Sequence, residues 1–589
     1  MKKHIFAFAI FFILIGAVTF PLVFKITSYI PGFFSSDENF APIWDAWRIK
    51  FCSADNLSIK SSDLTAYPFG ISFYADQSIG HLFFLVNYVL AIFTTPILTY
   101  NLQVLANIFL SAFFTYFLVL NITGHRLSAV LSGIIFAFCP YMSTRSWQHL
   151  GETYLWMLPL FLWSLLRLRE NNNFRVKVIF ILSVVFTTFN FDATYYSFVI
   201  GLAFLVFLSA RLNANKVYIR RIFLLVIIAC CALSIQFFPI VRNIIVKKHS
   251  IASAHNVYHR PFEDLFIQSA RPLSYFLPAV SHPLFGNFTR RFVGSPLYGV
   301  SFTEHTLYLG WFPLILAFIA IRRWRKLRRK TNAPLKDSYL GFFILLSLVA
   351  WLFSQPPWWE IGPVKIFMPS FFMYKILPMF RAYCRFGVVV MFSVAVLAGC
   401  GLRFVLDKFK GKAVRVLISG FFCSLVLFEF WTWPPYKVID VSKAPSVYYW
   451  LKERKDSFVI AEYPLDVDLP NEMYKFYQTF HEHPIVNATV PGTYPNRVAR
   501  SITKLSDKHT ASVLQWLGVE YVLVHRQGYL DKEIISWTEE LKRIPKNSGL
   551  KLIKNFPPEN CPAAIKCIQE SGPIDVYEVI AKPQPPKVK

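Results

Sequence analysis

The chain has 589 residues, of which 55% are hydrophobic, 18% aromatic and 16% charged. Long apolar stretches alternate with short basic segments, which excludes an ordinary soluble protein and indicates a polytopic α-helical membrane protein. The net charge of +27 does not indicate a nucleic-acid partner, because much of it lies in loops where the preference for cytoplasmic Lys and Arg explains it.

The first apolar stretch, residues 5–30, follows two lysines at the amino terminus. It is long enough to cross about 30 Å of hydrocarbon and too long for the apolar part of a signal peptide. The lysines predict a cytoplasmic amino terminus and an external next loop, which carries Asp37 and Glu38. A carboxylate at the outer membrane surface is well placed as a general base, although an arbitrary loop acid is more often simply solvated.

Basic loops at 167–177, 211–221, 322–330 and 403–415 mark the cytoplasmic side. They predict further spans near 100–121, 128–142, 153–168, 178–191, 195–210, 222–241, 306–321, 339–354, 385–403 and 414–433. If residues 79–95 also crossed, the loop carrying Asp37 would have to lie on both sides. We therefore predict a juxtamembrane helix there and about eleven transmembrane helices, with the carboxyl terminus outside.

The segment 434–589 differs in composition from the membrane module, residues 1–433. Strands are predicted at 457–463, 518–525 and 575–580, and helices at 446–454, 471–480, 509–517 and 531–543. This alternation predicts an external α/β domain, with a disordered Pro- and Lys-rich tail from about residue 582. Cys561 and Cys567 could form a disulfide in an oxidising compartment, but their spacing leaves this open.

Several short motifs occur in a characteristic order. They are Asp37-Glu38, Tyr67–Gly70, Tyr100–Leu102, Thr123–Arg126, Phe136–Pro140, His149-Leu150, Leu158–Leu160, Tyr308–Gly310 and Phe380–Phe386. With them, residues 1–433 resemble the GT-C superfamily of multispanning glycosyltransferases, which includes the protein O-mannosyltransferases and the aminoarabinose and arabinofuranose transferases. Within that group the chain looks most like bacterial YfhO-like integral membrane proteins.

The resemblance implies transfer of a sugar from a polyprenyl-phosphate carrier to a glycan, lipid or protein acceptor on the outer face of the cytoplasmic membrane. An inverting single displacement needs a carboxylate to take the acceptor proton, and Asp37, with Glu38 beside it, is the candidate. The leaving phosphate needs cations, among which Arg binds oxyanions best. The outer loops supply Arg145, Arg242, Lys247, Lys248, Arg271, Arg290, Arg291, Lys375, Arg381 and Arg385.

Arg381 and Arg385 are one helical turn apart, which favours them as the carrier-binding pair over anchoring to lipid headgroups. His149 and Glu152 lie in an outer turn where the superfamily often carries a second acid. Asp192 lies in a tight outer turn, as a helix N-cap or as an active-site group. Glu304 and His305 border a large outer loop and could contact sugar hydroxyls.

We expect no cofactor, although a divalent metal is not excluded. His481-x-His483 and Asp466-x-Asp468 have ligand-like spacing but lack further ligands nearby in the sequence. Two other functions remain open besides the enzyme. One is a lipid-linked sugar transporter, which should show paired charges inside spans; the other is a non-catalytic cell-envelope assembly protein that displays the segment 434–589.

Overall fold

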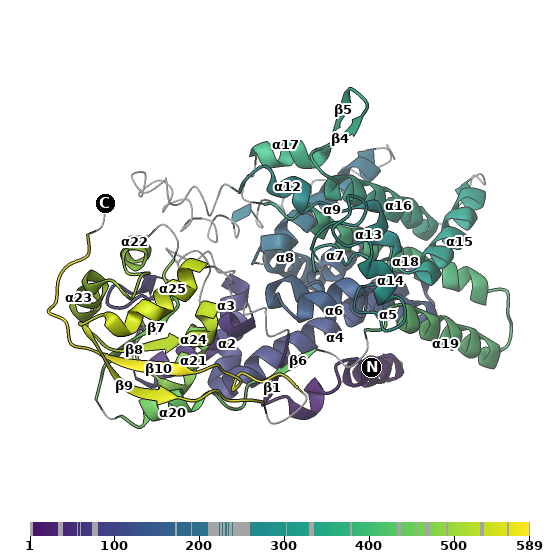
Figure 1. Cartoon of the computed structure of the whole chain (residues 1–589). Coiled ribbons are helices and arrows are strands. Elements are labelled where there is room, and N and C mark those ends of the chain that lie inside the picture. The colour runs from purple at the N-terminus through teal and green to yellow at the C-terminus, as the bar shows by residue number, and fades with distance from the viewer. Residues whose placement is uncertain are drawn as a thin grey trace.

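A computed structural model describes most of the chain. The described residues are 4–32, 39–55, 57–58, 61–72, 81–170, 173–189, 191–209, 260–301, 303–328, 335–376, 378, 380–432, 437–454, 456–465, 472–490, 493–530, 535–561 and 565–587, with isolated positions between 223 and 238. The helical part of the molecule lies at one end and a smaller part with a mixed sheet at the other (Figure 1). The predicted span at 222–241 lies outside the continuously described residues.

Apolar helices build the larger part. They are α4 (Pro96–Thr123), α5 (Arg126–Ala137), α7 (Met157–Glu170), α8 (Phe174–Phe189), α9 (Phe191–Ser209), α15 (Trp311–Arg328), α16 (Leu335–Ser354), α18 (Gly387–Leu406) and α19 (Lys412–Glu429). Each overlaps one of the spans predicted between 100 and 210 or between 306 and 433. The long apolar runs therefore predicted where helices form.

Helix α18 is the centre of this part, because nearly all its residues are buried and it contacts α5, α15 and α16. Two glycines allow the close packing. A Cβ at Gly401 would lie 1.9 Å from the Leu316 carbonyl oxygen, and one at Gly399 would lie 2.0 Å from the Ser132 hydroxyl. Small residues at such contacts let helix backbones approach closely, which is typical of membrane helix packing.

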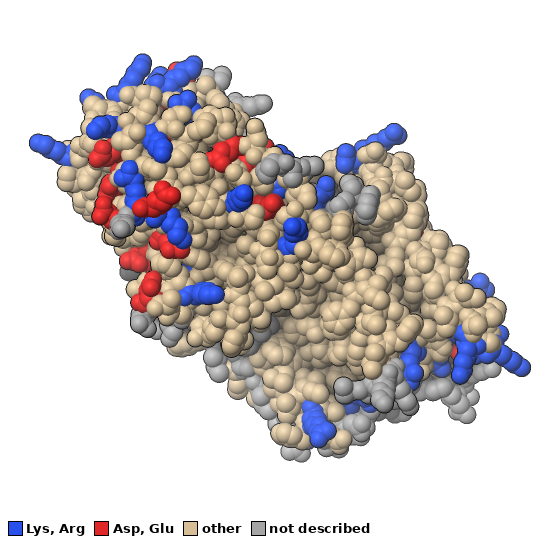
Figure 2. Space-filling model, turned by 90° about the horizontal axis from the view of Figure 1, so that it is seen from below, with Lys and Arg blue, Asp and Glu red and all other residues tan. Residues whose placement is uncertain are grey.

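Two described helical segments are long and apolar enough to cross a membrane, Pro96–Thr123 and Tyr383–Leu406, and a bent pair of helices is a third candidate. In one view of the surface, charged side chains gather toward two ends and few lie on the band between them (Figure 2). This distribution is typical of a membrane protein. The count of about eleven spans goes beyond what these helices establish and stays a prediction.

The bent pair is α5 and α6 (Pro140–Ser146), which meet at 45°. Proline has no backbone N–H and disfavours helical geometry at the residue before it, so Pro140 ends α5 and begins α6. The sequence predicted a single span over 128–142. The break instead turns α6 away from the direction of α5, which matters for the site described below.

The apolar run at 5–30 is not one helix. Helix α1 (Ile5–Val18) has 14 residues, about 21 Å, and is followed by the short helix η2 (Leu22–Lys25) and the strand β1 (Tyr29–Pro31). Pro21 interrupts the run. The expectation of an unbroken first span is therefore wrong for the part beyond Val18.

The predicted juxtamembrane helix corresponds to α3 (His81–Phe93). Its 13 residues span about 20 Å, less than the hydrocarbon thickness, and it contacts α2 (Phe40–Ala54) and α4. Thr95 caps the start of α4 by accepting a hydrogen bond from the Leu98 N–H at 3.3 Å. A separate short helix before α4 agrees with the sequence, and its place in the outer interface stays a prediction.

The C-terminal part, residues 437–587, contains a four-stranded sheet in the order β7 (Val459–Tyr463), β8 (Val519–His525), β10 (Ile574–Val579) and β9 (Leu550–Phe556). Strands β7 and β8 are parallel and the other pairs antiparallel. The helices include α20 (Ser446–Lys452), α21 (Glu472–His481), α23 (Lys508–Trp516) and α25 (Ile535–Arg543), as predicted. The unpredicted β9 is an edge strand whose lysines gave it no clear apolar pattern.

The C-terminal part is fastened to the amino-terminal segment. Strand β1 pairs antiparallel with β6 (Val438–Asp440), and the Trp44 indole N–H donates to the Gln478 side chain at 2.8 Å. A disulfide joins Cys561 and Cys567. The tail from residue 582, for which disorder was predicted, forms no helix or strand up to 587, and the Gln584 N–H donates to the Ser512 carbonyl at 3.0 Å.

Candidate functional site

Four charged side chains from separate parts of the chain meet in the helical part, and we call them the charged cluster. Arg145 comes from α6, Glu152 from the single turn η4 (Leu150–Thr153), Glu304 from the loop before α15, and Arg385 from the short helix η5 (Tyr383–Phe386). The Arg145 side chain is fully buried, whereas that of Arg385 is 18% exposed. Two guanidinium groups therefore face two carboxylates at the ends of apolar helices.

Glu304 is held by both arginines. Arg145 donates to its two carboxylate oxygens at 3.2 and 2.7 Å, and Arg385 donates to the same oxygens at 2.7 and 3.2 Å. The Cys384 thiol adds a contact at 3.3 Å. Paired guanidinium–carboxylate hydrogen bonds of this kind are among the strongest in proteins and fix both partners in orientation.

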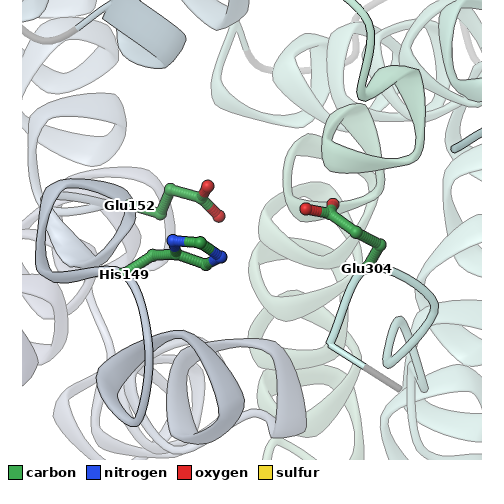
Figure 3. Close-up of side chains that lie close together, drawn as sticks. All are labelled: His149, Glu152 and Glu304. Carbon is green, nitrogen blue, oxygen red and sulfur yellow. The ribbon is translucent and has the colours of Figure 1, made fainter. Parts of the chain in front are cut away.

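Glu152 contacts the same arginines through single atoms. Its Oε1 lies 2.6 Å from Arg385 Nη1, and its Oε2 lies 2.9 Å from Arg145 Nε without hydrogen-bond alignment. His149 and Glu152 project from one side and Glu304 from the other, so that the three side chains face each other (Figure 3). Each offers an atom within 4.8 Å of the others.

The two carboxylates differ in acidity. At Glu304 burial raises the pKa, but the attraction of Arg145 and Arg385 outweighs it and holds the pKa well below its usual value. At Glu152 burial is the larger effect and raises the pKa, although Arg145 and Arg385 oppose it. Glu304 therefore keeps its charge more firmly than Glu152.

The loop of Glu304 is held in place by His305. The buried His305 ring contacts the carbonyl oxygens of Ser269 at 3.0 Å and Ser301 at 3.1 Å. Gly299, at φ +99°, allows this packing, because a Cβ there would lie 2.3 Å from the ring. His305, predicted to contact sugar, is thus placed to position its neighbour Glu304.

Arg381 and Arg385 do not share a helix face. Arg381 precedes η5 and pairs with Asp264 at 3.2 Å, and its side chain is 42% exposed. The expectation of one helical turn over 381–385 is wrong, because a short 3-10 helix begins only at Tyr383. Only Arg385 joins the charged cluster.

Asp192 is the second residue of α9, so it is not the N-cap of that helix, and its side chain lies outside the described residues. The sequence predicted either a cap or an active-site group. An acid in the first helical turn still interacts favourably with the helix dipole, without being the cap itself.

Asp37 and Glu38 lie outside the described residues, whereas Gly32 and Asn39 lie within them. Asn39 donates hydrogen bonds to the carbonyl oxygens of Pro31 and Trp147 and accepts one from the Tyr100 hydroxyl at 2.8 Å. Gly32, at φ +145°, packs against the same two groups, since a Cβ would lie 2.7 Å from the Asn39 amide and 3.1 Å from the Trp147 oxygen. Both ends of the segment 33–38 thus meet at Trp147, two residues after Arg145.

The acids of the charged cluster are not arranged as free metal ligands. Every oxygen of Glu152 and Glu304 already contacts a guanidinium group. A cation there would have to displace an arginine and would be repelled by the other. The geometry instead suits an anion that replaces one of the carboxylates.

Sequence reasoning named four members of this neighbourhood, His149, Glu152, Glu304 and Arg385, but gave Arg145 no particular role. Arg145 was one of ten cations assigned to outer loops. The signal that could have found it is its place in the apolar stretch Phe136–Trp147, where an isolated charge demands a partner.

Three solved glycosyltransferases have a similar arrangement of helices. The arabinofuranosyltransferase AftD from Mycobacteria matches with a TM-score of 0.56 at 14% identity, over 99% of this chain and 40% of AftD. ArnT from Cupriavidus metallidurans, solved with undecaprenyl phosphate, matches with 0.50 at 11% identity, over 98% and 99% of the two chains. The archaeal oligosaccharyltransferase AglB from Archaeoglobus fulgidus, solved with an inhibitory peptide and a dolichol-phosphate, gives 0.50 at 11%, over 92% and 72%.

The chain therefore has the fold of the GT-C glycosyltransferases. At these identities the likeness establishes the fold alone, and the chain spans less than half the length of AftD. No curated protein matches the sequence. A family model described as a domain of unknown function, DUF6311, matches residues 13–424, and the chain belongs to this family. The closer likeness to YfhO-like proteins stays a prediction.

Proposed function

We propose that the protein is a GT-C-type glycosyltransferase that moves a sugar from a polyprenyl-phosphate carrier to a glycan, lipid or protein acceptor. In an inverting displacement the acceptor oxygen forms the new bond to the anomeric carbon. The bond from that carbon to the carrier phosphate breaks, and the acceptor proton passes to a carboxylate. The products are the glycosylated acceptor and the free polyprenyl phosphate.

The observation that carries the proposal is the charged cluster within this fold. Arg385 is partly exposed beside the fully buried Arg145, so one guanidinium is accessible and the other is fixed behind it. Such a pair suits a phosphate whose negative charge grows as it leaves. His149, half-buried beside them, completes a polar surface that a sugar phosphate could contact.

Asp37 is the proposed general base and Glu38 the neighbouring alternative. The support comes from Asn39, the next residue in the chain, which is hydrogen-bonded to the Trp147 carbonyl. Trp147 lies two residues from Arg145 and two from His149. A segment attached at this point has the reach to bring a carboxylate to an acceptor beside the charged cluster.

We further propose that residues 1–433 form the membrane module and that 434–589 form an external domain, with the amino terminus in the cytoplasm. The disulfide between Cys561 and Cys567 supports an oxidising, external location for the C-terminal part. Topology reporters at residues 60 and 125 should read external and cytoplasmic, respectively. The same side for both would contradict the arrangement.

The test is turnover of purified protein in nanodiscs with a panel of polyprenyl-phosphate sugars, followed as release of polyprenyl phosphate. Asp37→Asn keeps the shape but cannot take a proton, so turnover should fall by roughly a hundredfold or more. Donor affinity and membrane insertion should stay unchanged.

Glu38→Gln is the matched control, because adjacent side chains point in different directions. If only Glu38→Gln abolishes transfer, the two roles are exchanged. If the intact donor crosses the bilayer and neither variant matters, the protein is a lipid-linked sugar transporter instead.

A further inference from the structure

We propose that Glu152 is an exchangeable counter-ion that occupies the place of the carrier phosphate on Arg385 and Arg145, whereas Glu304 stays bound to both arginines. This inference rests on the proposed carrier site. It assigns different tasks to two acids that contact the same two cations. Glu304 orients the arginines, and Glu152 keeps them neutralised until an anionic substrate arrives.

The contacts of the two acids are unequal. Glu304 accepts four hydrogen bonds, two from each guanidinium. Glu152 makes one contact to each, and that to Arg145 lacks hydrogen-bond alignment. Because a paired contact is stronger than a single one, an incoming anion displaces Glu152 more readily than Glu304.

The backbone that carries Glu304 is also held more firmly than the backbone that carries Glu152. The Glu304 loop is clamped by the buried His305 ring, and the Glu304 N–H donates to the Ser301 hydroxyl at 3.2 Å. Glu152 lies on a single 3-10 turn of four residues, next to the exposed Gly151, which has open space where a Cβ would be. Leu150, Glu152 and Thr153 are buried, so the turn is open only at Gly151, but a single turn with one open face moves at lower cost than a clamped loop.

The side chains of Glu152 and Glu304 are almost equally exposed, at 8% and 10%, but the chain next to Glu152 reaches the open surface at Gly151. Gln148 and His149, just before η4, are half-buried and Gly151 is exposed, whereas Arg145 and His305 are fully buried. An anion entering from this side meets Glu152 and the accessible edge of Arg385 before it meets Glu304.

Charge balance favours an exchange. The two guanidinium groups and the two carboxylates sum to zero, so a phosphodiester would leave a buried net charge of minus one. Buried uncompensated charge is strongly unfavourable. If Glu152 moves into solvent as the phosphate binds, the buried charge returns to zero and both arginines keep partners.

The test compares the dissociation constant of undecaprenyl phosphate, the probe, for the full-length protein and its variants in nanodiscs. Glu152→Gln removes the competing charge and should lower the constant at least tenfold. Glu304→Gln, the same chemical change on the other acid, should not lower it. Equal tightening by both variants, or none by Glu152→Gln, would overturn the exchange.

Arg385→Gln separates the inference from the proposed function. If Arg385→Gln weakens binding but Glu152→Gln changes nothing, the carrier site stands and the exchange is wrong. If Arg385→Gln leaves binding unchanged, the carrier site itself is wrong.

A measurement on the unaltered protein covers the case of a variant that does not fold. On addition of undecaprenyl phosphate, amide hydrogen exchange should rise at residues 150–153 and stay constant at 301–305. Release of the 301–305 loop with η4 still protected would overturn the inference.

Discussion

The charged cluster of the helical part and Glu462 of the C-terminal part both contain buried glutamate carboxylates, but these carboxylates have different partners. In the C-terminal part, the fully buried Glu462 carboxylate accepts hydrogen bonds from the Tyr448 hydroxyl at 2.7 Å and contacts His525 Nε2 at 2.8 Å. In the helical part, Glu152 and Glu304 face two arginines, which stay charged at any physiological pH. A carboxylate bound by a hydroxyl and an imidazole stabilises a core, whereas permanent cations can also bind a substrate anion.

The largest expected effect is the loss of stability when Glu304 is replaced. Glu304→Ala leaves two mostly buried guanidinium groups short of a partner and should lower the free energy of unfolding by about 3–5 kcal/mol. Glu462→Gln keeps an oxygen for the Tyr448 hydroxyl and should cost only about 1 kcal/mol. Thermal unfolding of both purified variants measures the difference, and a larger loss for Glu462→Gln would reverse our assignment of the stronger network.

The second largest effect distinguishes Arg385 from Arg381 in the binding of the carrier. Arg385→Gln removes a charged donor of the cluster and should weaken the binding of undecaprenyl phosphate by roughly tenfold to a hundredfold. Arg381→Gln removes an exposed ion pair with Asp264 and should change binding by no more than about threefold. Titration of both variants in nanodiscs distinguishes them. Equal weakening would show that the two arginines act as the pair that the sequence suggested.

The smallest effect tests the C-terminal part alone. Burial holds the pKa of His481 well below its usual value, and the nearby His483 lowers it further. Below about pH 6.5 the unfolded chain therefore binds a proton that the folded chain does not, so stability falls as the pH decreases. The loss should approach about 1.4 kcal/mol per pH unit. Unfolding midpoints at pH 7.5, 6.5 and 5.5 measure it, and an unchanged slope in His481→Asn would contradict this origin.

The sequence predicted the helices because long apolar runs leave few alternatives in a membrane protein. It also predicted three strands of the sheet and the separate short helix before α4. It missed β9, where lysines obscure the pattern, and the break at Pro140, which divides an apparent span. It placed Arg381 and Arg385 on one helix, although the chain there forms only a short 3-10 turn.

The sequence could not predict that the four residues of the charged cluster meet. These residues come from segments up to 240 positions apart, and local pattern carries no information on which loops touch. Buried charge gives the only local hint, since Arg145 interrupts an apolar stretch and needs a partner somewhere. The proposed base at Asp37 rests on position in the chain and on the attachment of Asn39.

The pairing of β1 with β6 has a consequence for the order of assembly. Tyr29–Pro31 is synthesised about 400 residues before its partner Val438–Asp440, which at roughly 5–20 residues per second is a delay of tens of seconds. During that time the helices can enter the membrane before β1 has its partner strand β6. Since the Pro31 carbonyl also accepts a hydrogen bond from Asn39, the pairing of β1 with β6 supports one of the contacts of Asn39. The proposed carrier site is complete once Arg385 has been synthesised, about 50 residues before β6, so the proposed acid loop gains the support of β6 after that site has been made.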